Sequence, residues 1–333
     1  MRSSRGSNED PVVKIRAERA SFALANPFRI SRGVRTHAEV VVAHVTDGSH
    51  EGQGECTPYA RYGETVEGVM ADIEAWSGAD RRELRSMPNG AARNALDCAL
   101  WDGEAKRAGR RVWQLAGLPE PKPVRTVMTV SLDDPAAMEA AAKATNGRSL
   151  LKIKLGARDG GDDERIRAVR RAAPDATLVC DANEGWTVDE LDRYLAAARE
   201  AKLAMVEQPL PVGEDEALRG VDAGVPLGAD ESFHTSADLE RLAGLYDVVN
   251  IKLDKTGGLT EALATAEAAR AQGFAVMVGC MMATSLAMAP ATLVAQGARF
   301  VDLDGPLWMA ADRDPGLVYR GEHVAPPTPD VWG

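Results

Sequence analysis

Charged residues follow short apolar stretches at nearly constant intervals through the second half of the sequence. From Lys154 the steps to Asp181, Glu207, Asp230 and Lys252 are 27, 26, 23 and 22 residues. An interval of this length holds one β-strand and the helix that returns the chain to the next parallel strand. The five side chains are therefore predicted to lie at one height, at the carboxyl ends of successive strands. Packing alone does not explain buried charge repeated at this interval.

Eight apolar stretches alternate with segments of helical periodicity, which is the strand count of a (β/α)8-type barrel. The predicted fold class is therefore α/β, a (β/α)8-type (modified TIM) barrel with an α+β capping domain. The predicted barrel strands are residues 125–132, 150–155, 176–180, 204–206, 226–228, 248–253, 274–279 and 300–303. Little helix-forming sequence follows Leu303, so the eighth helix is the weakest element of the prediction.

The first third of the chain has a different pattern and is predicted to form the capping domain. Strands are expected at 12–17 and 39–45, joined by a loop over 26–35 that contains proline, glycine and three arginines. Helices are expected from 64 to 116, and within 91–109 the apolar residues form one stripe with charges opposite. A proline-rich joint at 118–123 separates this region from the barrel.

These boundaries predict two domains. The capping domain comprises residues 11–123, and the catalytic barrel domain comprises residues 124–314. The last residues, 315–333, are expected to pack back on the capping domain.

Composition limits the partners and the compartment. The net charge of −11 argues against nucleic acid and anionic membranes as partners. Residues 1–11 lack the apolar core of a signal peptide, and the four cysteines are far apart, without zinc-site spacing. Residues 271–298 carry no charge, but glycine and proline interrupt them, which favours a buried strand, a loop and a helix over a membrane span. A cytoplasmic protein with reduced cysteines is expected.

Three of the strand-end residues are carboxylates, and three carboxylates on adjacent strands repel one another unless a cation lies between them. Asp181, Glu207 and Asp230 offer only oxygen ligands, which favours a hard ion such as Mg²⁺, with Mn²⁺ as the alternative. A site without metal would instead pair each carboxylate with a lysine or arginine.

The lysines suggest the chemistry. Lys152 and Lys154 lie two residues apart, so a strand directs both to one face. Two lysines with this spacing also fit an edge strand, where their charges would prevent pairing with the strands of other molecules. Lys154 and Lys252, however, fall on strands on either side of the carboxylates, as two bases acting on opposite faces of one carbon require. Burial, a metal ion and Lys152 are expected to lower the pKa of these amines.

These motifs together resemble the muconate-lactonizing subgroup of the enolase superfamily, over nearly the whole chain. The matching motifs are Lys-x-Lys at 152–154, Asp-Ala-Asn at 181–183, Glu-Gln-Pro at 207–209, Asp-Glu-Ser at 230–232 and Asn-Ile-Lys-Leu at 250–253. Asp302-Leu303-Asp304 looks like the pair that holds the substrate's α-ammonium in dipeptide epimerases. The resemblance therefore implies epimerisation of L-Ala-D/L-Glu-type dipeptides, in murein peptide recycling.

The resemblance also implies residue roles. Lys154 and Lys252 would be the acid/base catalysts, Asp181, Glu207 and Asp230 the metal ligands, Lys152 a contact of the substrate carboxylate, Asp302 and Asp304 contacts of its ammonium, and Asn183 and Gln208 residues that support the ligands. In the 26–35 segment, Arg32 or Arg35 would receive a glutamate γ-carboxylate, although solvated surface arginines fit equally well. Thr129 is expected to contact the substrate through its hydroxyl or to be solvated.

Two other functions remain open at this point. A cycloisomerase or o-succinylbenzoate synthase would share the fold and the metal, but its substrate has no ammonium group for Asp302 and Asp304. A catalytically silent metal-binding barrel would not need both lysines. The exact dipeptide, the arginine that contacts it, loop closure and any homo-oligomer are not determined by the sequence.

Overall fold

The computed structural model describes residues 14–78 and 80–333, and its centre is a sheet of eight parallel strands. The sheet order is β12-β11-β10-β9-β8-β7-β6-β5. The N–H of Val127, just before β5, donates to the carbonyl of Val301 in β12 at 2.9 Å, so the end strands also meet. The strands are β5 (Met128–Val130), β6 (Leu150–Lys154), β7 (Thr177–Asp181), β8 (Met205–Glu207), β9 (Leu227–Ala229), β10 (Val248–Ile251), β11 (Ala275–Val278) and β12 (Phe300–Val301). The predicted barrel with eight strands is confirmed.

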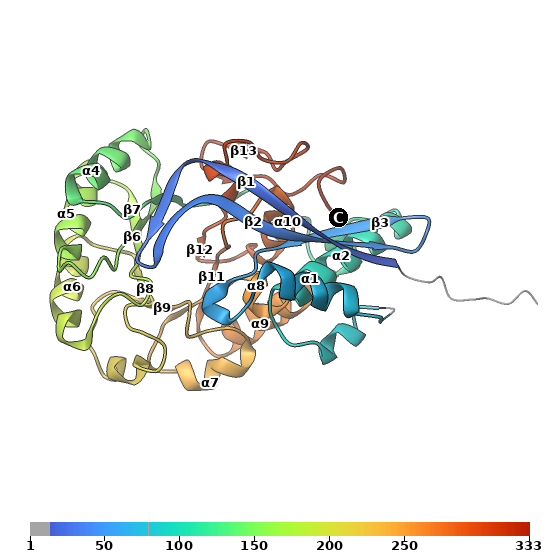
Figure 1. Ribbon diagram of the computed structural model, residues 1–333. Helices are drawn as coiled ribbons and strands as arrows, with labels where there is room; N and C mark the ends of the chain where they lie inside the picture. Colours follow the sequence, from blue (N-terminus) through green and yellow to red (C-terminus); the bar gives the residue numbers. More distant parts are fainter. Residues whose placement is uncertain (1–13, 79) are drawn as a thin grey trace, which may run out of the picture.

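Helices cover the outside of the sheet (Figure 1). They are α4 (Pro135–Ala144), α5 (Asp162–Ala172), α6 (Val188–Glu200), α7 (Leu239–Leu242), α9 (Leu259–Ala271) and α10 (Ser285–Val294). β11 and α10 account for half of the uncharged segment 271–298, in the predicted order of strand, loop and helix, and no described helix is long and apolar enough to cross a membrane. After β12 the only helical element of the described residues is the 3-10 helix η5 (Gly305–Trp308), in agreement with the scarcity of helix-forming residues there.

The capping domain begins with a long hairpin of β1 (Lys14–Ile30) and β2 (Gly33–Thr46), which β3 (Glu51–Cys56) extends to three antiparallel strands. The prediction of a loop over 26–35 is therefore wrong. Pairing of Phe28 with Arg35 continues the hairpin, and a register shift between Ala23 and Phe28 accommodates Pro27, which has no N–H to donate. Figure 1 shows the hairpin reaching across the barrel. The start of the predicted 12–17 strand lies outside the described residues.

Three helices complete this domain: α1 (Val66–Ala75), α2 (Ala91–Ala108) and α3 (Val112–Leu115). Much of the charged side of α2 is buried, because the helix packs between β3 and the barrel helices, whereas Lys106 and Arg107 in its last turn are exposed. Arg93, Asp97 and Asp102 are all buried. Asp97 accepts hydrogen bonds from the N–H and hydroxyl of Thr260 in α9, at 2.9 and 2.6 Å.

The C-terminal segment contacts both parts of the molecule. Its short strand β13 (Tyr319–Arg320) pairs with β14 (His323–Val324), and β14 pairs with β4 (Val124–Arg125). Farther on, the Trp332 indole donates to the carbonyl of Cys98 at 3.0 Å, and the N–H of Gly333 donates to Asp102 at 2.8 Å. The domain ranges 11–123, 124–314 and 315–333 stay predictions.

Glu55 in β3 joins the capping domain to the barrel through a buried carboxylate. It accepts hydrogen bonds from the N–H and hydroxyl of Thr284, at the start of α10, and from the guanidinium of Arg313. The carboxylate side chain is 0% exposed. Removing it therefore leaves buried donors without an acceptor.

We expect Glu55→Ala to lower the free energy of unfolding by about 3 kcal/mol, the scale for breaking a buried ion pair. Urea unfolding measures the change. Glu51→Ala is the matched control, because Glu51 lies on the same strand with its side chain 47% exposed. Equal effects of the two substitutions would contradict the buried anchor.

Candidate active site

Three of the predicted residues are neighbours across the barrel strands. Lys154 in β6 is in register with Asp181 in β7, and Asp181 is in register with Glu207 in β8. Glu207 pairs with Gly228 of β9, so Asp230 lies two residues farther along. The prediction of one height is thus wrong for Asp230, because barrel strands are staggered. A two-residue offset preserves the face, and all three carboxylates point to one place.

The three carboxylates form a compact buried cluster. Oxygens of Asp181, Glu207 and Asp230 lie within 4.8 Å of one another. Burial, reinforced by the charge of Asp181, raises the pKa of Glu207 to about 7. Every atom in this donor set is an oxygen, and a divalent cation is the simplest charge that would relieve the crowding. The residues present therefore fit Mg²⁺ or Mn²⁺.

Lysine amines contact each carboxylate. Lys154 Nζ lies 2.6 Å from Asp181 Oδ2, and Lys252 Nζ lies 2.6 Å from Asp230 Oδ2. Lys152 Nζ lies 2.6 Å from Glu207 Oε2, yet that oxygen accepts no hydrogen bond of acceptable geometry among the described residues. The lysines alone thus leave Glu207 Oε2 without a hydrogen bond, which favours a bound metal ion over the metal-free alternative. β6 lies between β5 and β7, so the edge-strand interpretation of Lys152 and Lys154 is wrong.

The expected lowering of lysine pKa is not found at Lys252. Burial does lower it, and so does the charge of Lys152, but attraction to Asp230 and Glu207 outweighs both and raises the pKa of Lys252 well above its usual value. Cationic charge at the carboxylates would reduce that attraction. The same balance raises the pKa of Lys152, which is opposed by burial and favoured by Asp302, Glu207 and Asp181.

A second acidic pair lies across the barrel mouth, after β12. Asp302 and Asp304 are only 6% and 4% exposed, so they do not form a solvated loop. Asp302 accepts a hydrogen bond from Lys152 at 2.8 Å. Asp304 accepts the backbone N–H of Thr129 at 2.8 Å and the Trp308 indole at 3.3 Å. Burial and the charge of Asp302 raise the pKa of Asp304 to about 6, so this pair attracts a cation.

The structure separates the two candidate arginines. Arg32, at the tip of the hairpin, is engaged with protein groups: its guanidinium lies 2.7 Å from Glu231 and 3.0 Å from the Tyr59 hydroxyl. Arg35 stacks over the Tyr59 ring, 5.2 Å from its centroid, and forms no ion pair with a carboxylate of the described residues. Both arginines line the same cavity, and Arg35 is the one with its charge unpaired.

Asn183 and Gln208 lie beside the carboxylates, both with left-handed backbone. The N–H of Asn183 donates to Asp181 Oδ1 at 2.9 Å. Gln208 accepts the N–H groups of Asp230 and Ser232 at 3.0 Å, which holds the turn that carries Asp230. These contacts agree with the predicted supporting position, and their functional role stays a prediction.

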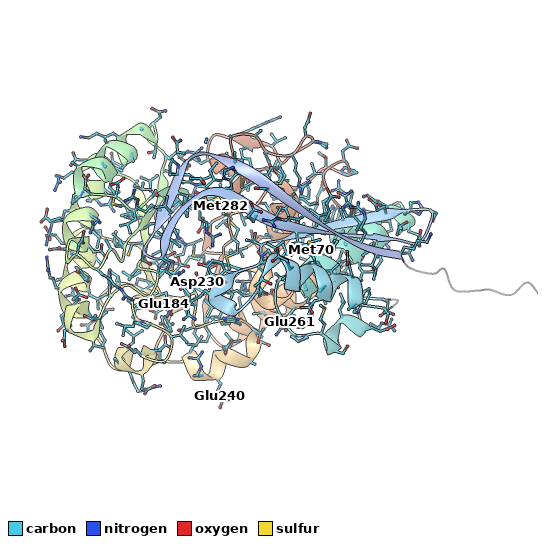
Figure 2. The ribbon with its side chains drawn as sticks, viewed as in Figure 1. Met70, Glu184, Asp230, Glu240, Glu261 and Met282 are labelled. Carbon is cyan, nitrogen blue, oxygen red and sulfur yellow. The ribbon has the colours of Figure 1, made fainter. Side chains whose placement is uncertain are left out.

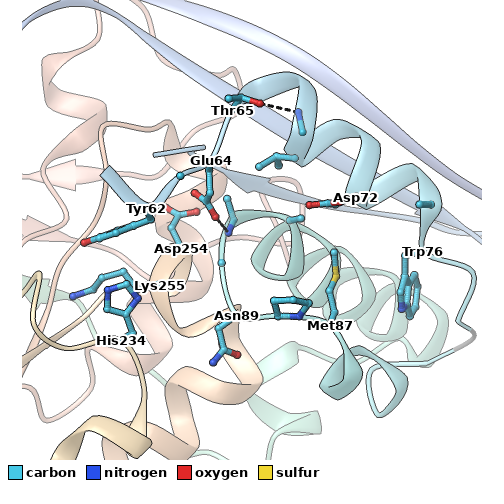
Figure 3. Close-up of a pocket in the computed structure, with 18 residues that line it drawn as sticks. Tyr62, Glu64, Thr65, Asp72, Trp76, Met87, Asn89, His234, Asp254 and Lys255 are labelled. Atoms are coloured by element: carbon cyan, nitrogen blue, oxygen red, sulfur yellow. Dashed lines mark hydrogen bonds between the residues drawn. The ribbon is translucent and has the colours of Figure 1, made fainter. Parts of the chain in front are cut away.

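These residues surround a cavity of about 70 Å³ at the barrel mouth, beneath the hairpin. Asp230 and Glu184 lie near the centre of the molecule in Figure 2, whereas Glu240 lies at its outer edge. The cavity at the barrel mouth is lined by Phe28, Ile30, Arg32, Arg35, Tyr59, Thr129, Lys154, Asn183, Lys252, Cys280, Met281, Met282, Asp302, Asp304 and Gly305. A larger cavity of about 570 Å³ lies beside α1 (Figure 3), but neither Lys154 nor Lys252 lines it. The chemistry therefore belongs to the smaller cavity.

Sequence reasoning did not assign several residues around the site. Asn250 and Lys255 contact carboxylates of the cluster, Glu231 contacts Arg32, and Tyr59 contacts both arginines. A signal existed for Asn250, which lies two residues before Lys252 in an extended segment and so shares its face. Tyr59 and the sulfur-containing wall at 280–282 gave no comparable signal, because only the tertiary structure brings them to the cavity.

The sequence matches two family models that together span most of the chain. Residues 13–117 match the mandelate racemase/muconate lactonizing enzyme N-terminal domain, and residues 136–329 match the enolase C-terminal domain-like family. A structure from Agrobacterium tumefaciens, described as an enolase family member with homology to dipeptide epimerases and containing L-Ala-L-Glu, is 54% identical. It superposes with a TM-score of 0.94, over 96% of this chain and 100% of that one.

Two relatives differ in their named substrate. The L-Ala-D/L-Glu epimerase of Escherichia coli (strain K12) is 46% identical, over 92% of this chain and 97% of its own. The N-acetyl-D-glutamate racemase of a Pseudoalteromonas species is 42% identical, over 88% of this chain and 95% of its own. Both family models and both relatives lead to one conclusion: the chain belongs to the mandelate racemase/muconate lactonizing enzyme family, within the enolase superfamily.

Proposed function

We propose that this chain is a dipeptide epimerase that inverts the α-carbon of the second residue in L-Ala-D/L-Glu-type dipeptides. The observation that carries the proposal is the placement of Lys154 and Lys252 in one cavity, with buried Asp302 and Asp304 across from the carboxylate cluster. The cytoplasmic location and the role in murein peptide recycling stay predictions. The four described cysteines form no disulfide with one another.

Lys154 and Lys252 supply the proton transfer. Each amine lies within 2.6 Å of a different carboxylate, Asp181 or Asp230, and both side chains are about nine-tenths buried. A substrate carbon between them would lose its proton to one amine and gain a proton from the other on the opposite face. Lys152 would hold the substrate carboxylate, and its positive charge would stabilise the negative charge that develops on the carboxylate oxygens.

Asp181, Glu207 and Asp230 would hold the Mg²⁺ ion. When bound, the ion neutralises negative charge on the substrate carboxylate as the α-proton leaves. Structures of related dipeptide epimerases from Cytophaga hutchinsonii and Enterococcus faecalis contain Mg and a dipeptide. The chain's own contribution is a dry, preformed set of oxygens, since all three carboxylates are 1% exposed or less.

Substrate selection is proposed to come from the two ends of the cavity. Asp302 and Asp304 form an anionic end that suits a free α-ammonium group. Arg35 supplies an unpaired cation from the hairpin, which suits an acidic second side chain. Arg32 is less suited to this task, because Glu231 and Glu184 already engage its guanidinium.

N-acetylglutamate is the second candidate substrate, because one relative at 42% identity is named a racemase of that compound. It shares the carboxylates of the dipeptide but has no ammonium group. The buried Asp304, which forms no ion pair with a lysine or arginine of the described residues, would then face an uncharged acetyl group, with an unrelieved electrostatic cost. The acidic pair therefore favours the dipeptide.

Exhaustive chelation should abolish turnover, and added Mg²⁺ should restore it, because the cluster needs a cation to stabilise the charge that develops. Glu207→Gln should lower kcat/KM by about a hundredfold or more, the scale of several kcal/mol of electrostatic stabilisation. Glu240→Gln, on the outer edge of the molecule, is the control. Full activity of chelated enzyme would refute metal dependence.

Lys154→Ala and Lys252→Ala should each stop net epimerisation, because each removes one of two bases. Proton NMR in D2O follows exchange of the α-proton. Each variant should exchange only one epimer, and the epimer should differ between the two variants. The exposed Lys143→Ala should behave as wild type. Near-normal epimerisation by either single variant would rule out the two-base mechanism.

L-Ala-L-Glu should be turned over with higher kcat/KM than N-acetyl-L-glutamate. Asp304→Asn should reduce turnover of the dipeptide by about a hundredfold, since it weakens the site for the ammonium, and should leave the acetylated compound little affected. Arg35→Met should reduce the preference for L-Ala-L-Glu over L-Ala-L-Leu by about tenfold, with the exposed Arg29→Met as control. Preference for N-acetylglutamate in the wild type would favour the racemase assignment.

A further inference from the structure

Lys255 contacts the carboxylate cluster but does not line the substrate cavity. It belongs to α8 (Leu253–Thr256), three residues after Lys252, and is 1% exposed. Its Nζ lies 2.7 Å from Asp230 Oδ1, 2.6 Å from the Asp230 carbonyl and 3.0 Å from the Asn250 carbonyl. Three acceptors match the three N–H groups of one ammonium.

The carboxylates of the cluster share a pattern in which a donor of the chain occupies one oxygen of each. Lys255 holds Asp230 Oδ1, the side-chain amide of Asn250 holds Glu207 Oε1 at 2.6 Å, and the N–H of Asn183 holds Asp181 Oδ1 at 2.9 Å. The other oxygen of each carboxylate is paired with a different lysine: Glu207 Oε2 with Lys152, Asp181 Oδ2 with Lys154 and Asp230 Oδ2 with Lys252. The two oxygens of Asp230 thus have different lysine partners, and only the partner of Oδ2, Lys252, lines the substrate cavity.

Single-oxygen ligation discriminates between ions of equal charge. Mg²⁺ takes six ligands in a near-ideal octahedron, whereas Ca²⁺ takes six to eight and accepts both oxygens of one carboxylate. We propose that Lys255 is a positioning residue that makes this site selective for Mg²⁺ over Ca²⁺, by holding Asp230 Oδ1 so that an ion binds Asp230 through Oδ2 alone, in place of Lys252. The inference rests on the proposed metal-dependent function.

The surroundings of Lys255 fix its position. Its nitrogen lies 5.7 Å from the centroid of the buried Phe233 ring. Its side chain borders the cavity of Figure 3, where its nitrogen is turned away from Asp254. Asp254 does not compete for the ammonium, because its Oδ1 accepts the Thr57 N–H and the Asn94 side-chain amide. Lys255 is therefore committed to Asp230.

The test is titration of metal-free protein with Mg²⁺ and with Ca²⁺ by isothermal calorimetry, without substrate. In Lys255→Met both oxygens of Asp230 become available, so the ratio of the Kd for Ca²⁺ to that for Mg²⁺ should fall about tenfold or more, the scale of one charge-assisted hydrogen bond. Lys106→Met is the matched control, since it also removes a lysine 2.8 Å from a buried aspartate, Asp102, but far from the cluster in the capping domain. Its ratio should equal that of wild type.

Lys255→Gln provides a second variant that keeps an N–H donor, and it should shift the ratio in the same direction but less. If wild type binds Mg²⁺ and both folded variants keep its selectivity, this inference fails and the proposed function stands. If wild type binds neither ion, the proposed metal dependence fails.

A measurement on the wild type decides the case in which neither variant folds. In a crystal structure with Ca²⁺, Asp230 should bind through Oδ2 alone, with Oδ1 still on Lys255. Binding through both oxygens would overturn the proposal.

Discussion

Crowding of like charge in a buried space governs this molecule. Asp181, Glu207 and Asp230 bring three carboxylates into a space less than 5 Å across, from which water is largely excluded. Such a cluster persists only because positive charge and hydrogen-bond donors surround it on every side. Lys154 and Lys252 line the substrate cavity, as does Asn183, whereas Lys152, Lys255 and Asn250 contact the carboxylates without lining it. The barrel supplies rigid strand ends on which this balance is built.

Reaction chemistry and substrate choice come from different parts of the chain. The proposed acid, base and metal-binding groups lie on barrel strands or directly after them, where hydrogen bonds between the strands fix their positions. The hairpin of β1 and β2 instead brings Arg35 to the cavity from the capping domain, and the contacts of Arg32 with Glu231 and Tyr59 fasten the hairpin tip over the barrel mouth. This division permits the selecting residues to vary without disturbing the catalytic ones.

The two named substrates among the relatives differ at one chemical group, the free ammonium. Asp302 and Asp304 are the residues of this chain that we expect to bind the ammonium group, because their burial makes an unpaired negative charge costly. Their neighbours support the same view: the Thr129 N–H and the Trp308 indole fix the orientation of Asp304, but neither supplies a positive charge. An ammonium group does, and in an extended dipeptide it lies at the far end from the reacting carbon.

The sequence by itself determined the barrel, the carboxylate cluster and the lysines that face it. Strand alternation and the βα interval are local properties, so they identify which residues share a face and which strands adjoin, as for Lys152 with Lys154 and for Asp181 with Glu207. Tertiary structure decided everything that depends on a distant partner. The 26–35 segment became a hairpin because its two halves pair, and Asp230 moved two residues up because barrel strands are staggered. Arg32 forms an ion pair with Glu231, whereas Arg35 forms none with a carboxylate of the described residues, and Lys255 pairs with Asp230. The partner of a charged side chain can lie far away in the sequence, so in these cases the tertiary structure decided which opposite charge the side chain contacts.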